Sequence, residues 1–159
     1  MVPASRINPV NRMRILVPVD LSEATAAVMA VARRAAQACN GSLILLHVAE
    51  PNPGFVGYEA GPEVVRDQVA REYREQHRTL HSLAEDLRSE GIEAIALLIQ
   101  GQFAKSILKE AERLEADFIV MGTHGHGAMF NLIVGSVGHA VIRDTTVPIL
   151  LVPLRKPSP

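Results

Sequence analysis

The chain is organised around the stretch Met121-Gly122-Thr123-His124-Gly125-His126-Gly127 and the Val134-Gly135-Ser136-Val137 that follows it. The apolar, β-branched run 117–121 predicts a buried strand that ends in this stretch. Three glycines then fall within positions 122–127, and Gly135 with Ser136 opens a segment of helical spacing. Glycines let backbone N–H groups approach a ligand, and a helix start offers N–H donors without intrahelical partners. A strand, a glycine loop and a helix start together predict a phosphate-binding site.

The spacing of these residues is G-x2-G-x9-G-S, over Gly122, Gly125, Gly135 and Ser136. It is not a Walker P-loop, because no Gly-Lys-Ser/Thr follows. It is not the dinucleotide fingerprint either, because that motif follows the first strand of its fold. A plainer interpretation is that the glycines serve only as turns and Ser136 only as a helix cap. The number of glycines favours a ligand site.

Composition predicts one soluble, cytoplasmic domain. The chain has 159 residues, 48% of them hydrophobic, which is enough for a real core. Its 16 Lys and Arg balance 17 Asp and Glu without a basic cluster, which argues against nucleic acid as the main partner. The single cysteine excludes an internal disulfide and fits a reducing compartment. The run of apolar residues needed to cross a membrane is absent, and we expect disorder in an arm at 1–12 and a tail at 155–159.

Apolar runs alternate with amphipathic segments along the domain, 13–154. Strands are predicted at 14–20, 42–49, 93–99, 117–121 and 147–154. Helices are predicted at 23–39, where Ser22 is a good N-cap, and at 63–90, 102–115 and 136–143. This alternation predicts the α/β class: a five-stranded parallel sheet in the order 3-2-1-4-5 with helices on both faces. Ligands of such sheets bind between strands one and four, so we expect Asp20 to meet the loop at Gly122.

These features resemble the universal stress protein family from Arg14 to Pro153. The resemblance is carried by five segments of the chain: Ile15–Asp20 with Ser22, Leu45–Val48, Gly101, Asp117–Ser136 and Val147–Val152. It implies a Rossmann-like fold of the adenine nucleotide alpha hydrolase type. Because members with the full glycine signature bind ATP, it implies ATP as the ligand, with Mg²⁺ on the phosphates. It also implies a homodimer that forms through strand 147–154.

The resemblance places adenosine at the carboxyl ends of the strands. It implies that the Asp20 carboxylate lies near the ribose and that the backbone of Val48 meets the adenine edge. A carboxylate suits a sugar hydroxyl, which supports the first of these roles. The matched positions around adenosine are Pro18, Val19, Asp20, Val48, Met121 and Gly122. A second interpretation is that Asp20 only caps the helix that follows it.

The resemblance places the phosphates at the glycine loop and the helix start. The matched positions are His124, Gly125, Gly135, Ser136 and Val137. N–H groups and a hydroxyl suit phosphate oxygens. The chain departs from the family at His126, where family loops often carry Arg or Lys. Neutral histidine attracts phosphate less at pH 7, so we expect a lower or more pH-dependent affinity.

Three functions are compatible with these observations. The first is a nucleotide-binding regulatory protein of the stress response. The second is an ATP-using enzyme, either a slow ATPase or a protein that phosphorylates itself, for example on Ser136. The third is a structural dimer whose site stays empty, against which the intact glycines argue. Catalysis has little support, because no base–nucleophile pair converges and no catalytic or metal-ligating set is predicted; His77 and His81 have metal-binding spacing but no further ligand.

Overall fold

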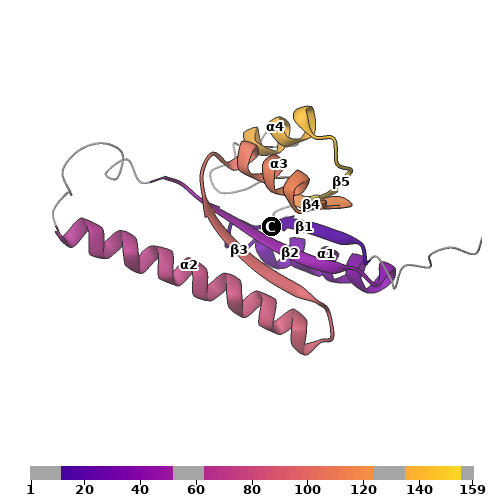
Figure 1. Ribbon diagram of the computed structural model, residues 1–159, viewed down its shortest axis with the longest axis horizontal. Helices are drawn as coiled ribbons and strands as arrows, with labels where there is room; N and C mark the ends of the chain where they lie inside the picture. Colours follow the sequence, from indigo (N-terminus) through magenta and orange to yellow (C-terminus); the bar gives the residue numbers. More distant parts are fainter. Residues whose placement is uncertain (1–11, 52–62, 124–134, 155–159) are drawn as a thin grey trace, which may run out of the picture.

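A five-stranded sheet in the order β3-β2-β1-β4-β5 forms the middle of the domain (Figure 1). The structure, a computed structural model, describes residues 12–51, 63–123 and 135–154. Each neighbouring pair of strands is parallel, so the predicted class and strand order are confirmed. The strands are β1 (Arg14–Pro18), β2 (Ser42–Ala49), β3 (Ala94–Gln100), β4 (Phe118–Gly122) and β5 (Ile149–Val152).

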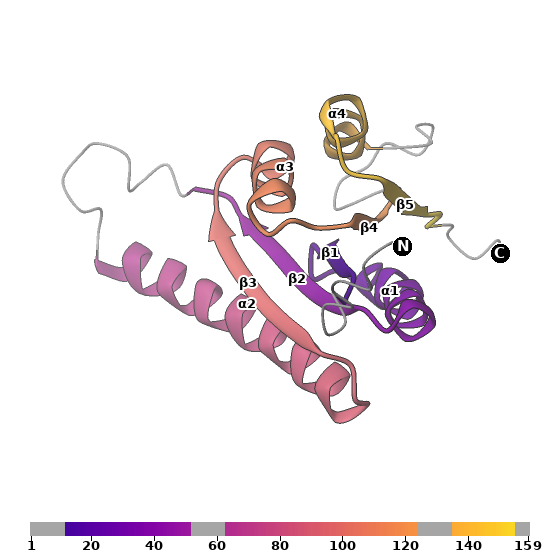
Figure 2. The ribbon, with the colours of Figure 1, turned by 45° about the vertical axis from the view of Figure 1, so that its right-hand side comes forward.

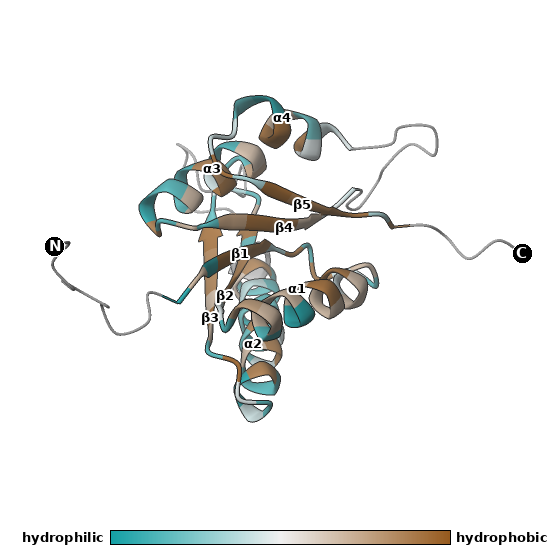
Figure 3. Cartoon of the chain, turned by 90° about the vertical axis from the view of Figure 1, so that its right-hand side faces the viewer, coloured by the Kyte–Doolittle hydropathy of each residue, from teal (hydrophilic) through white to brown (hydrophobic). Residues whose placement is uncertain are grey.

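Helices cover both faces of this sheet, as predicted. One face carries α1 (Thr25–Cys39) and α2 (Glu63–Ser89), and the other carries α3 (Phe103–Arg113) and α4 (Ser136–Asp144), as Figures 2 and 3 show. Alternate residues of a strand point to opposite faces. Leu45 of β2 therefore packs with α1 and α2, whereas its neighbour Leu46 packs with α3 and α4. Burial on both faces explains why the inner strands are mostly apolar rather than alternating.

The turn from β1 into α1 differs from the prediction. We expected Ser22 to cap a helix over 23–39, but α1 begins at Thr25; the Ser22 hydroxyl does accept from the Ala24 N–H at 3.2 Å, whereas the N-cap residue Ala24 makes no side-chain cap bond. The Asp20 carboxylate organises this turn instead. Its Oδ1 accepts hydrogen bonds from the backbone N–H of Ser22 at 3.0 Å, from the Ser22 hydroxyl at 2.6 Å and from the Thr25 hydroxyl at 3.3 Å. These bonds hold the chain in a turn for two more residues before the helix starts.

The fifth strand is shorter than predicted. We expected it to cover 147–154, but β5 pairs with β4 only from Ile149 to Val152. Pro148 and Pro153 stand at its two ends, and proline has no N–H to donate to a ladder. The expected edge position is confirmed.

Gly41 joins α1 to β2 where the start of β1 passes close by. A Cβ at this position would lie 2.9 Å from the carbonyl oxygen of Met13, 3.0 Å from Cys39 Sγ and 3.3 Å from Ile15 Cδ1. We expect Gly41→Ala to lower the free energy of unfolding by about 1–3 kcal/mol, because the backbone must shift. Urea unfolding measures this change. The matched control is Gly135→Ala, whose Cβ would meet nothing nearer than 3.8 Å; an equal loss in both variants would contradict the steric explanation.

Candidate functional site

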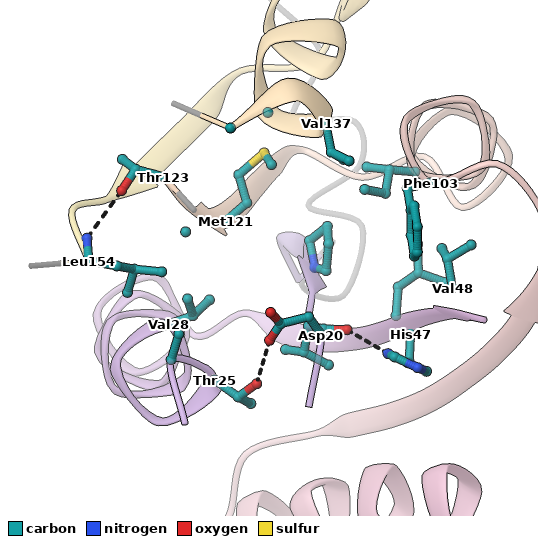
Figure 4. A pocket seen from close by; sticks show the side chains of 18 of the residues that line it. Asp20, Thr25, Val28, His47, Val48, Phe103, Met121, Thr123, Val137 and Leu154 are labelled. Atoms are coloured by element: carbon teal, nitrogen blue, oxygen red, sulfur yellow. Dashed lines mark hydrogen bonds between the residues drawn. The ribbon is translucent and has the colours of Figure 1, made fainter. Parts of the chain in front are cut away.

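A pocket of about 260 Å³ opens at the carboxyl ends of β1 and β4 (Figure 4). It lies at the point where the chain changes sides of the sheet. The loop after β1 leads to α1 on one face, and the segment after β4 leads to α4 on the other. The helices that follow β1 and β4 thus lie on opposite faces of the sheet, and such a switch point is where parallel α/β sheets bind ligands. The volume is close to the lower end of the roughly 300–1,000 Å³ that small-molecule sites occupy.

The structure brings the predicted site residues together around this pocket. Its walls include nine of the eleven positions, from β1, β2, β4 and α4: Pro18, Val19, Asp20, Val48, Met121, Gly122, Gly135, Ser136 and Val137. The other two predicted positions, His124 and Gly125, lie outside the described residues, as does His126. Positions 20 and 122 therefore line the same pocket, as expected from the strand order.

Asp20 has two roles in this geometry. It holds the turn before α1 through the three bonds to its Oδ1, so the interpretation of Asp20 as a local cap is partly right. It also lines the pocket, where Figure 4 shows its carboxylate beside Thr25 and Val28. The two roles are compatible, because a carboxylate has two oxygens that can accept bonds.

Thr123 connects the end of β4 to β5, to the segment after β5 and to the start of α4, a role that the sequence did not reveal. Its N–H donates to the Val152 carbonyl at 3.0 Å, its carbonyl accepts from the Gly135 N–H at 2.8 Å, and its hydroxyl accepts from the Leu154 N–H at 3.1 Å. The side chain of Leu154 lies over Gly122, where a Cβ would be only 2.5 Å from Leu154 Cδ1. Glycine at 122 thus makes room for the segment after β5.

Helical side chains complete the pocket, and most of them are apolar. Phe103 and Ile107 come from α3, and Thr25 and Val28 come from α1. Figure 4 shows Phe103 reaching from α3 toward Val48 at the end of β2. The sequence predicts the helices that carry these residues, but no local pattern shows which turn of each helix lies beside the strand ends. They give the pocket apolar walls on both sides of the sheet, with Phe103 and Val137 in the same cluster.

Electrostatics at the start of α4 favour a negative ligand group. Gly135 is its N-cap, and the first turn carries no acidic residue. The charged residues are at the other end, where hydrogen bonds from Arg143 lower the pKa of the Asp144 carboxyl. The positive end of the helix dipole, with N–H groups that have no intrahelical partner, therefore faces the pocket.

The described ranges contain neither a cluster of metal ligands nor a helix that could cross a membrane. Within 12–51, 63–123 and 135–154, no three His, Cys, Asp or Glu side chains gather closely enough to hold a metal ion. The rings of His77 and His81 lie 4.2 Å apart between centroids on α2. In the same ranges no helix combines the length and apolarity that crossing a membrane requires.

Fold and pocket together define an α/β domain with a ligand pocket at the switch point of a five-stranded parallel sheet. The chain belongs to the universal stress protein family, whose model matches residues 11–153. A universal stress protein of Thermus aquaticus is 34% identical over 144 residues, which cover 87% of this chain and 96% of that protein. The family resemblance of the sequence is confirmed.

Solved structures agree with the fold. A protein of Methanocaldococcus jannaschii, itself a universal stress protein, superposes with a TM-score of 0.78 at 24% identity, covering 93% of this chain and 100% of its own. A universal stress protein of Archaeoglobus fulgidus was solved in complex with dAMP; it has a TM-score of 0.62 at 23% identity, over 90% and 99% of the two chains. A further universal stress protein, solved in complex with cAMP, has a TM-score of 0.66 at 18% identity. The match covers 89% of this chain and 97% of that chain.

Proposed function

We propose that this chain is an ATP-binding universal stress protein that acts as a nucleotide-dependent regulator in the cytoplasm. One observation carries the proposal: residues from β1, β2, β4 and α4 converge on a single pocket at the switch point. These residues include Asp20, with its carboxylate, and the pair Gly135 and Ser136, which lies more than a hundred positions further along the chain. Adenine nucleotides in two solved members of the family support the same class of ligand.

The chemistry of the pocket matches the three parts of a nucleotide. The apolar wall around Val48 and Phe103 suits a base. Asp20 can accept hydrogen bonds from ribose hydroxyls. The start of α4, with Ser136 and the backbone N–H groups of its first turn, suits phosphate oxygens. Mg²⁺ would then be held mainly by the phosphates themselves, because the described residues offer no cluster of metal ligands.

Two experiments test this proposal. Acid treatment of freshly purified protein releases any bound nucleotide for identification, and calorimetric titration measures the affinities for ATP, AMP and cAMP. We expect a bound adenine nucleotide and the highest affinity for ATP with Mg²⁺. Phosphate release measured in the same samples tests the alternative, a slow ATPase or a protein that phosphorylates Ser136. Protein that carries no nucleotide and gives no heat with any of the three ligands would overturn the proposal.

Ser136 is the residue with which the phosphate side of the proposal can be tested. It is exposed at the first position of α4 and lines the pocket. We expect Ser136→Ala to weaken ATP about fivefold, which is the loss of one hydrogen bond of about 1 kcal/mol. Ser89→Ala is the control, because Ser89 lies at the end of α2 and its hydroxyl bonds the Asp86 carbonyl. Equal affinities of the two variants would argue against phosphate at the start of α4.

We also propose that two copies of the chain pair through β5, as the resemblance implies. The support from the structure is that β5 is an edge strand of four apolar residues, with Leu150 43% exposed. An exposed apolar edge favours association.

A further inference from the structure

The structure places His47, a histidine of the buried strand β2, at the pocket. It lies near the end of β2, is 7% exposed and lines the pocket. Its Nδ1 lies 2.8 Å from the carbonyl oxygen of Val19 (Figure 4). A carbonyl oxygen can only accept, so Nδ1 carries the proton and donates it. The imidazole therefore links β2 to the loop that follows β1.

The peptide groups on both sides of Val19 are held by β2. The N–H of Val19 donates to the Leu46 carbonyl at 2.9 Å, and its carbonyl accepts from His47 at 2.8 Å. The regular β1–β2 pairing ends one residue earlier, at Pro18 and Leu46. The imidazole thus adds one more hydrogen bond between β2 and the chain after β1, at the peptide bond that joins Val19 to Asp20.

The chain turns sharply immediately after this bond. Leu21 has a φ of 60°, in the left-handed region that non-glycine residues seldom adopt. Such a conformation costs on the order of 1 kcal/mol or more and persists only where its surroundings fix it. Two sets of bonds do so here: those of the Asp20 carboxylate on the far side of the turn, and that of His47 on the near side.

We infer that His47 is a positioning residue, which through the Val19 carbonyl sets the direction in which the Asp20 carboxylate enters the pocket. The inference rests on the proposed function, in which Asp20 binds the hydroxyls of a nucleoside ribose. His47 affects that contact indirectly, through its hydrogen bond to the backbone carbonyl of Val19. The start of α4, proposed for the phosphates, belongs to another element, and the base wall at Val48 shares β2 with His47 but takes no part in this hydrogen bond.

The ratio of the affinities for ATP and for 2′,3′-dideoxy-ATP distinguishes a positioning role of His47 from a general effect on the stability of the domain. The wild type is expected to bind ATP at least about tenfold more tightly than 2′,3′-dideoxy-ATP, since hydrogen bonds to a carboxylate are strong. Asp20→Asn should bring this ratio toward one. His47→Leu should do the same and leave the affinity for the dideoxy ligand within about twofold. A His47→Leu variant that keeps the wild-type ratio, or that loses both ligands equally, would overturn the inference.

His47→Asn is the conservative variant, because its amide nitrogen is as many bonds from Cα as Nδ1. It keeps a donor for the Val19 carbonyl but has no counterpart of Nε2. Positioning predicts that Asn restores the ribose ratio, whereas a direct contact between Nε2 and the ligand predicts that it does not. Loss of discrimination in both variants would therefore overturn the inference.

A measurement without ligand separates this inference from the proposed function. In the ¹⁵N–¹H spectrum of the protein alone, His47→Leu should shift the amide signals of Asp20, Leu21 and Ser22, and His47→Asn should shift them less. Signals that stay in place in His47→Leu would show that the imidazole does not position the turn. A wild type that binds neither nucleotide would instead refute the proposed function, and these signals would still decide the role of His47.

Discussion

Leu45→Ala is expected to lower the free energy of unfolding by about 2–5 kcal/mol, a large part of the roughly 5–15 kcal/mol that holds a typical domain together. Leu45 is 0% exposed in β2, where it packs with residues of α1 and α2. Alanine would leave a cavity between the sheet and two helices, which the strand cannot close because β1 and β3 hold it on both sides.

Urea unfolding followed by circular dichroism measures this loss as a lower midpoint at an unchanged slope. Ile95→Ala is the matched control, since it removes a branched side chain from a strand of the same sheet. Ile95 lies on the edge strand β3 and is 48% exposed. We expect it to cost about 1 kcal/mol or less. Similar losses in the two variants would mean that the two faces of the sheet are not packed as described.

The contrast between Leu45 and Ile95 shows which part of the fold could be predicted. Both lie in continuous apolar runs, so periodicity identifies two strands without ranking their burial. Alternation with helices and the place of the glycine loop then determine the strand order, which is confirmed. The end of β1 could not be predicted, because it depends on bonds with partners distant in the sequence, such as that from the Val19 N–H to the Leu46 carbonyl.

Some residues of the candidate site could be predicted from the sequence, and others could not. Asp20, Met121 and Ser136 could be predicted, because strand ends and helix starts are marked in the sequence and the topology places them together. Phe103 and Leu154 could not. Phe103 reaches the pocket through the place where α3 crosses the sheet, and Leu154 through its bond to Thr123 after β5 ends. Such contacts depend on packing geometry that no local pattern records.

Leu150→Asp is expected to convert the proposed dimer into monomers while leaving the domain folded. Leu150 is the exposed residue of β5, whereas Ile149 and Leu151 pack against the α3–α4 side of the sheet and Val152 is buried. An aspartate at 150 would place a charge in the apolar contact between two copies without opening the core of either. At 151 the same change would disturb the core, so a loss of dimers there would be ambiguous.

Sedimentation at micromolar concentration measures the outcome. We expect the wild type to sediment near twice the chain mass of 17.2 kDa, and Leu150→Asp to sediment at 17.2 kDa with an unchanged circular dichroism spectrum. Ile95→Asp is the control, because it puts the same charge on the other exposed apolar edge and should leave the dimer intact. A wild type that sediments at 17.2 kDa would refute the dimer. If only Ile95→Asp dissociates the dimer, the interface lies at β3 and not at β5, because a charge weakens an apolar interface only where the two copies are in contact.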